Sequence, residues 1–355
     1  MKRTICFLAF AAILLSSCSI KGESPCINSR QAVGFGTYVG TTRTTAITTA
    51  NITSFGVYGY YSDGAPWSSN LVPNFMFNQK VEGSNASGFT YSPVKYWPNE
   101  QDDKLSFFAY APYMNGTNGI SENSLNITPG APTIKYEMPS SEESQADILW
   151  ATPVLNMAGR DQGASKVLLK FNHSLSALGM KIRYLAELQD LGGTVGDALA
   201  SGSKVYLNSV TFSSDFPSSG VLNLQDGSWS DVRSSASRSY TRSFGEAAQG
   251  LEVGKENSDI LSGDDLVLMI PRGSMEIAVS VTYTVITDDA SLKDGKSVIV
   301  NTISKSTTIN ASNGSKTDLV LVLGLTSVKF DAPEVSVWEF SSSLETEIDL
   351  PQNNA

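Results

Sequence analysis

The chain has 355 residues, which is longer than one hydrophobic core usually supports, so its length predicts two domains. Hydrophobic residues make up 41% of the sequence, which is sufficient for folding, whereas charged residues make up only 17% and the formal net charge is −10. This balance excludes the basic surface that binds nucleic acid or anionic lipid headgroups, so we expect no nucleic-acid partner.

The first 17 residues have the pattern of a bacterial secretion signal. Lys2 and Arg3 precede an apolar run at residues 5–15, which is too short to cross a bilayer as a stable helix. The run ends in small residues before Cys18, a pattern that resembles a bacterial lipobox. We therefore expect cleavage before Cys18, lipidation of its thiol and attachment to the outer membrane as a surface lipoprotein. The alternative is an ordinary secretory signal with an incidental cysteine.

The cysteine count predicts a fold without an internal disulfide. Cys6 leaves with the signal, Cys18 is acylated, and Cys26 then has no partner in the chain. Stability must therefore come from packing and strand pairing.

The next elements are a tether and a short strand. Residues 18–31 are polar and lack periodicity, which is typical of a flexible tether. In residues 32–39 the apolar Val33, Phe35 and Val39 lie at odd positions among small residues, which predicts a strand. Residues 41–49 are rich in threonine and contain one arginine, Arg43, so we expect an exposed segment there.

No segment before residue 140 shows a long helical period, so the first domain is predicted to be mostly β. Its further strand candidates are residues 54–61, 75–78, 90–93 and 105–110, with residues 83–88 as a loop. Residues 159–163 are predicted to connect the two domains. We place the N-terminal domain at residues 32–163 and the C-terminal domain at residues 164–355.

The second domain is predicted to begin with residues 167–182, read as one strand. Its apolar phase changes after Gly179, which predicts a bulge or kink at Leu178-Gly179. Residues 213–262 are predicted to form a serine-rich loop with one or two short strands. Turn signals separate the other strand candidates, as in antiparallel sandwiches; these are residues 205–212, 266–270, 276–286 and 297–303.

The sequence offers little catalytic chemistry, so we expect no enzyme, no metal site and no cofactor. It has no zinc-binding spacing, no phosphate-binding glycine loop and no Gly-x-Ser-x-Gly motif. The one histidine, His173, lies on the apolar phase of a strand and is interpreted as a core residue. Adjacent acids are interpreted as solvated turns, with a calcium site at Asp288-Asp289 or Asp264-Asp265 as a remote alternative.

Several short segments, in this order and spacing, resemble the fimbrillin family of Bacteroidales surface lipoproteins, particularly its Mfa-like branch. Each is weak alone, but together they span nearly the whole chain. They are Tyr96-Trp97-Pro98, residues 105–112, residues 146–151, residues 318–323, Val328-Lys329-Phe330 and residues 335–338. The resemblance implies an all-β chain with two tandem transthyretin-like β-sandwich domains.

The resemblance also implies a structural or accessory subunit of a type V pilus that functions in adhesion to host or bacterial surface ligands. In the family, an arginine-specific protease removes the N-terminal segment of the lipoprotein precursor, and the C-terminal strand of another subunit fills the groove that opens. Cleavage after Arg43 would free the strand with Val33, Phe35 and Val39, whereas cleavage after Arg30 would leave it in place. The alternative for Arg43 is an ordinary surface arginine.

Two C-terminal segments are candidates for the donor strand, because each alternates apolar and polar residues. One contains Val335 and Val337, and the other contains Leu344, Ile348 and Leu350 among acidic residues. The alternative for residues 344–350 is a frayed acidic tail.

A surface glycan-binding lipoprotein that does not polymerise is the second functional hypothesis, and a hydrolase is the third. Tryptophans in binding modules stack on sugars, and Trp67 and Trp229 lie in loop-like sequence where exposed contacts are expected. Trp97, Trp150 and Trp338 lie beside apolar residues and are expected to pack in the core or between domains.

Overall fold

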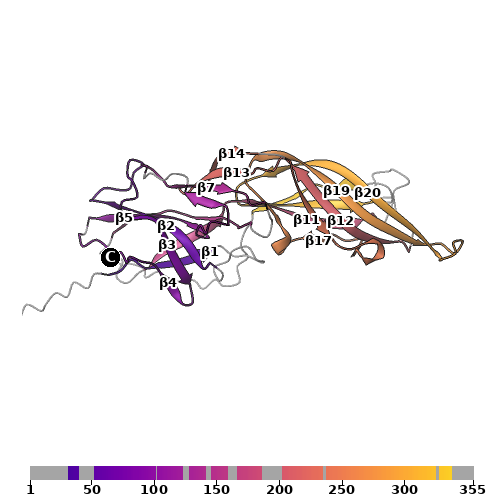
Figure 1. Ribbon diagram of the computed structural model, residues 1–355, viewed down its shortest axis with the longest axis horizontal. Coiled ribbons are helices and arrows are strands. Elements are labelled where there is room, and N and C mark those ends of the chain that lie inside the picture. The colour runs from indigo at the N-terminus through magenta and orange to yellow at the C-terminus, as the bar shows by residue number, and fades with distance from the viewer. Residues whose placement is uncertain are drawn as a thin grey trace, which may run out of the picture.

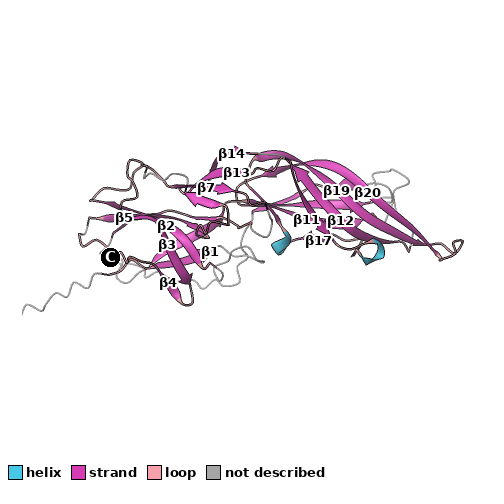
Figure 2. Ribbon diagram, viewed as in Figure 1, coloured by secondary structure: helices cyan, strands magenta, loops and turns pink. Residues whose placement is uncertain are grey.

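The computed structural model describes residues 31–39, 52–100, 102–122, 128–140, 145–158, 166–185, 202–234, 237–324 and 328–337. These residues form strands and loops with two short 3-10 turns, η3 (Ala247–Gln249) and η4 (Gly263–Asp265), as Figure 2 shows. The prediction of an all-β chain is confirmed. In the described part of the chain, no helix has the length and apolarity needed to cross a membrane.

The N-terminal lobe contains an eight-stranded sheet and a four-stranded sheet. In the larger sheet the strands follow the order β1 (Phe35–Val39), β10 (Val167–His173), β8 (Leu149–Ala151), β5 (Lys104–Ala111), β2 (Ser54–Ser62), β3 (Met76–Ser84) and β4 (Gly88–Thr90), and β9 (Val154–Ala158) also pairs with β5. The smaller sheet has the order β14 (Trp229–Arg233), β13 (Ser219–Asn223), β7 (Thr133–Glu137) and β6 (Ile120–Glu122).

Strands β2 and β5 are buried on both faces, which explains their nearly continuous apolar sequence. Phe55 and Phe107 point into one core, which the curled eight-stranded sheet encloses. Tyr60 and Phe108 point to the opposite face and pack into a second core with Tyr136 of β7. The four-stranded sheet therefore covers the outer face of β2 and β5.

The C-terminal lobe is a sandwich of two sheets around one core (Figure 1). The first sheet has the order β17 (Ser258–Leu261), β11 (Ser176–Tyr184), β21 (Ser315–Leu323) and β22 (Val328–Phe330), with β18 (Val267–Met269) on β11 and β23 (Glu334–Val337) on β21. The second has the order β15 (Arg238–Ser243), β12 (Lys204–Ser214), β19 (Gly273–Asp288) and β20 (Lys296–Ala311), with β16 (Leu251–Val253) on β12.

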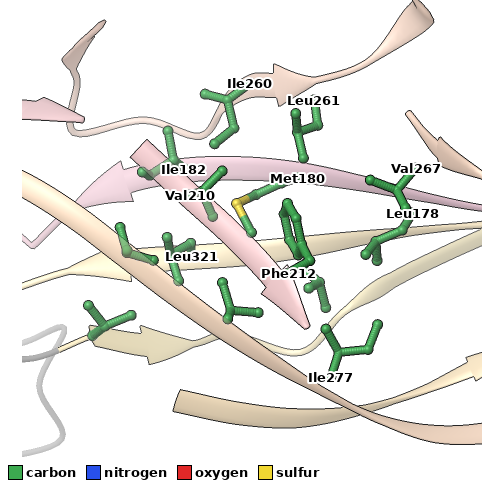
Figure 3. Packing of buried hydrophobic residues seen from close by; sticks show 14 of the residues in the cluster. Leu178, Met180, Ile182, Val210, Phe212, Ile260, Leu261, Val267, Ile277 and Leu321 are labelled. Atoms are coloured by element: carbon green, nitrogen blue, oxygen red, sulfur yellow. The ribbon is translucent and has the colours of Figure 1, made fainter. Parts of the chain in front are cut away.

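Alternating side chains from facing strands fill this core. Figure 3 shows Leu178 and Met180 of β11 pointing toward Phe212 of β12, with Leu321 of β21 beside them. All four side chains are fully buried. Packing of this kind stabilises the C-terminal lobe.

Residues 167–182 form two strands in two sheets, so the prediction of a single strand that opens the second domain is wrong. β10 pairs with β1 and β8 in the N-terminal lobe, whereas β11 pairs with β21 in the C-terminal lobe. The chain changes sheet at Ser174-Leu175, and not at residue 164. The apolar phase changes because each strand faces a different core. The register shift in β11 lies between Met180 and Lys181, and not at Leu178-Gly179.

Two further predictions differ from the structure. Residues 213–262 form five strands, β13 to β17. Serine and threonine are compatible with extended backbone at half-exposed sheet edges, so these strands form without an alternating apolar pattern. The sheets are also not purely antiparallel, since β1 pairs with β10 and β11 pairs with β21 in parallel. Parallel neighbours lie far apart in the sequence, so turn signals do not reveal them.

The β13–β14 hairpin ties the two lobes together. Trp229 Nε1 donates a hydrogen bond of 2.7 Å to the carbonyl of Ser174, where the chain passes between lobes. Asn313 Nδ2, just before β21, donates a 2.9 Å bond to the carbonyl of Gly227. The sequence after β12 therefore returns to cover the N-terminal lobe.

Candidate functional site

Strand β1 is the candidate functional element, because it lies among segments that are far from it in sequence. We call the surroundings formed by β10, Lys95 and Asn85 the cradle of β1. On one side it runs parallel to β10, with Phe35 opposite Val167 and Val39 opposite Phe171. On the other side the Val33 N–H donates to the carbonyl of Lys95 at 2.9 Å. The residues that lead into β1 are therefore paired on both sides, whereas β1 itself is the first strand in the order of the sheet.

The inward side chains of β1 and the residues before it complete the N-terminal core. Val33 and Phe35 are each 1% exposed. The Phe35 ring makes edge contacts with three aromatic rings, at centroid distances of 6.1 Å to Phe55, 5.6 Å to Tyr91 and 5.7 Å to Phe107. Removal of this strand would therefore leave a hole lined by aromatic side chains.

Asn85, in the hairpin between β3 and β4, holds the middle of β1. Its Oδ1 accepts from the Thr37 N–H at 3.2 Å and from the Thr37 hydroxyl at 3.3 Å, and its Nδ2 donates to the Thr37 carbonyl at 2.7 Å. Tyr91 adds a hydrogen bond from its hydroxyl to the carbonyl of Val33 at 2.7 Å. Burial raises the pKa of the Tyr91 hydroxyl.

The C-terminal edge of the described chain lies on β21 of the other lobe. β22 and β23 pair with successive halves of β21, with Phe330 opposite Leu321 and Val335 opposite Thr317. The Val335 side chain is 63% exposed. β23 therefore adds an edge to its own sheet mainly through its backbone.

Two ion pairs reach across β21 to this edge. Lys181 of β11 pairs with Glu334, and Arg183 Nη2 lies 3.1 Å from Asp331 Oδ2. The hydrogen bond from Lys181 to Glu334 raises the pKa of the lysine. Both pairs are partly exposed, so each contributes little to stability, about 0 to 1 kcal/mol.

The structure locates some of the predicted site residues and not others. Val33 and Phe35 lie in the core, and the backbones of Val39 and Val337 lie in β1 and β23. Cys18, Arg30, Arg43, Leu344, Ile348 and Leu350, like Trp338, lie outside the described residues. Sequence reasoning missed Asn85 and Tyr91, because only the folded chain brings them to β1.

His173 is a core residue paired with Asp147. Its Nδ1 lies 2.8 Å from Asp147 Oδ2, and the two side chains are 0% and 7% exposed. The pair is buried where β10 meets the segment before β8. Nowhere in the described ranges do three histidine, cysteine or acidic side chains gather as metal ligands would.

Trp67 and Trp229 do not form exposed stacking platforms, so that expectation is wrong. Trp67 packs against Tyr60 and Phe108, at centroid distances of 6.0 and 5.2 Å. Trp229 packs on Tyr136 and uses its ring nitrogen between the lobes. Trp97 is buried in the N-terminal core and Trp150 packs against the second core, as expected.

Comparison with known proteins agrees with this architecture. The chain is 29% identical over 189 residues to the fimbrium subunit Fim1C of Phocaeicola vulgatus, and the match covers 48% of each protein. The chain thus spans about half the length of this curated relative. Its fold is similar to the crystal structure of a fimbrial protein from Bacteroides vulgatus, with a TM-score of 0.66, 18% identity and coverage of 87% of this chain and 99% of that chain. Residues 42–320 match the fimbrillin-like family, so the chain belongs to that family.

Proposed function

We propose that the protein is a subunit of a cell-surface fimbria that assembles by strand exchange. Membership of the fimbrillin-like family and similarity to a fimbrium subunit support the role in a fimbria. The observation that carries the mechanism is the placement of β1. This strand completes the N-terminal core, yet it is followed at once by a threonine-rich segment that contains a single arginine, Arg43.

Cleavage after Arg43 by an arginine-specific protease removes β1 together with the lipid anchor expected at Cys18. The product has a groove lined by Phe55, Tyr91 and Phe107, with the edge of β10 that had paired with β1 left open. An open hydrophobic groove beside an unpaired strand edge is unstable in water, so a strand from another subunit binds there. Before cleavage, Cys18 holds the precursor on the outer membrane.

A cleavage assay tests this function. Purified chain lacking residues 1–18 is treated with an arginine-specific protease, and the products are examined by N-terminal sequencing, electrophoresis in SDS without boiling, and electron microscopy. We expect a new N-terminus at Thr44 and SDS-resistant multimers. Deletion of residues 338–355 should abolish the multimers but leave cleavage intact.

Two matched variants make the assay specific. Arg43→Gln should resist cleavage and remain monomeric, whereas Arg30→Gln should still be cut after Arg43 and assemble. A chain that is cut after Arg43 but stays monomeric at every concentration would contradict strand exchange.

A further inference from the structure

The cradle of β1 sets specific requirements for any strand that takes its place. Among the side chains that point into the core, the first is Val33 and the second is Phe35, which lies among three aromatic rings. The third position holds Thr37, which is 6% exposed and whose hydroxyl bonds to Asn85 Oδ1. A matching strand therefore carries an apolar residue, a phenylalanine and a hydroxyl residue at alternate positions.

The outward positions impose a second requirement. A Cβ at Gly34 would lie 3.3 Å from Cγ of Lys166, and a Cβ at Gly36 would lie 3.0 Å from Cδ2 of Leu168. Both neighbours are atoms of exposed side chains, Lys166 just before β10 and Leu168 within it, and can move. A small residue suits the place beside Leu168, and an acidic residue suits the place beside Lys166.

The seven residues that follow β23 meet both requirements. They read Trp-Glu-Phe-Ser-Ser-Ser-Leu from Trp338 to Leu344. We propose that residues 338–344 of a neighbouring subunit occupy the cradle in the direction of β1, and this inference rests on the proposed strand exchange. Trp338, Phe340, Ser342 and Leu344 take the places of Val33, Phe35, Thr37 and Val39.

The inward match is specific in two places. Phe340 supplies the ring that Phe55, Tyr91 and Phe107 contact edge-on, an arrangement that aromatic pairs favour. Ser342 brings a hydroxyl to Asn85, whose amide also binds the backbone at this position. Asn85 thus selects a small hydroxyl residue at the third inward position.

The outward match adds complementary charge. Glu339 takes the place of Gly34 beside Lys166, and Ser341 takes the place of Gly36 beside Leu168. The lysine side chain is exposed, so the attraction serves mainly to choose the register.

The place where the described chain ends also favours this segment. β23 ends at Val337, directly before the proposed donor, and it pairs with β21 of its own sheet. The donor strand therefore begins directly at the edge of its own subunit and needs no release of β23. A joint without a linker keeps successive subunits in a fixed orientation.

A reversed register is the alternative that the sequence offers. Residues 344–350 read from their C-terminal end also give an apolar, apolar, hydroxyl, apolar pattern, made by Leu350, Ile348, Thr346 and Leu344. This register places Ile348 at the site of Phe35, where an aliphatic side chain lacks the ring contacts. It also runs antiparallel to β10, so the parallel hydrogen-bond pattern that β1 makes would be lost.

Disulfide trapping distinguishes the registers. All three cysteines of the chain lie before Arg43, so the cleaved subunit has none. In β1, Gly36 lies opposite Leu168 of β10. The proposed register puts Ser341 at the place of Gly36, whereas the reversed register puts Glu347 at that place. Cleaved Leu168→Cys protein is mixed with cleaved Ser341→Cys, Ser343→Cys or Glu347→Cys protein, oxidised, and separated by non-reducing electrophoresis.

We expect the Leu168→Cys and Ser341→Cys pair to give a cross-linked dimer at least ten times more abundant than either other pair. Phe340→Ala should reduce SDS-resistant multimers at least tenfold, whereas Ile348→Ala should leave them unchanged. Preferential cross-linking to Glu347→Cys, or loss of multimers only with Ile348→Ala, would overturn the proposed register while strand exchange stands. Absence of multimers from the cleaved, unsubstituted chain would overturn strand exchange itself, and the register with it.

Discussion

The Asn85 side chain binds the backbone of Thr37 as a neighbouring strand would, accepting from its N–H at 3.2 Å and donating to its carbonyl at 2.7 Å. The residue comes from the turn between β3 and β4, at the opposite end of the eight-stranded sheet from β1. This contact joins the two ends of the curled sheet. It also makes the place of β1 dependent on one side chain that does not itself lie in a strand.

Replacement of Asn85 by alanine should loosen β1 selectively. The variant loses the hydrogen bonds to Thr37, so we expect a loss of about 1 to 2 kcal/mol and faster amide exchange at residues 33–39. Asn74→Ala is the matched control, because Asn74 makes the same two kinds of bond to the backbone of Tyr61. Hydrogen exchange measured by mass spectrometry checks both. Equal acceleration of residues 33–39 in the two variants would contradict a local role.

Truncation of Phe35 should destabilise the uncleaved protein strongly. The buried ring contacts three aromatic side chains, so Phe35→Ala should lower the free energy of unfolding by about 3 to 5 kcal/mol. Tyr38→Ala, in the same strand but 48% exposed, should change it by less than about 1 kcal/mol. Urea unfolding followed by tryptophan fluorescence measures both values. Similar values for the two variants would mean that β1 is not part of the core.

A methyl group at Gly227 should weaken the joint between lobes. Gly227 has a φ of +72°, and a Cβ there would lie 2.2 Å from Nε1 of Trp150, a rigid neighbour. Gly295→Ala controls for the backbone, because Gly295 has a φ of +66° and open space around it. We expect Gly227→Ala to lower the melting temperature several degrees more than Gly295→Ala does. An equal shift would show that Trp150 moves aside freely.

The ion pair between Lys181 and Glu334 should stabilise β23 in a pH-dependent way. The hydrogen bond raises the pKa of Lys181 above its ordinary value of 10.5 in the folded state, so the stabilisation is complete below pH 10.5. It is lost as the pH rises through the raised folded-state pKa. Glu334→Gln should lower the melting temperature slightly below pH 10.5, and the difference from the unsubstituted chain should shrink above it.

Glu252→Gln is the control for that experiment. The Lys204–Glu252 pair is longer, at 3.7 Å, and both side chains are 59% exposed, so its removal should have no measurable effect. A pH dependence of the same size in both variants would assign the effect to general surface charge.

Much of the local structure follows from the sequence alone. Alternation of Val33, Phe35 and Val39 predicts a strand, and the buried phase of residues 167–173 identifies one face of β10. Periodicity of two and turn residues are local properties, so they predict strands and the all-β class. The isolated histidine in an apolar phase likewise predicts burial, which the pairing of His173 with Asp147 satisfies.

The tertiary structure decides which strands become neighbours. The parallel pairing of β1 with β10 joins residues more than a hundred positions apart, and no turn links them. Tertiary packing also decides the contact of Asn85 with Thr37, the packing of the β13–β14 hairpin on the N-terminal lobe, and the division of residues 167–182 between two sheets. Sequence patterns report which face of a strand is buried, but the burying surface comes from distant segments whose positions depend on the packing of the whole core.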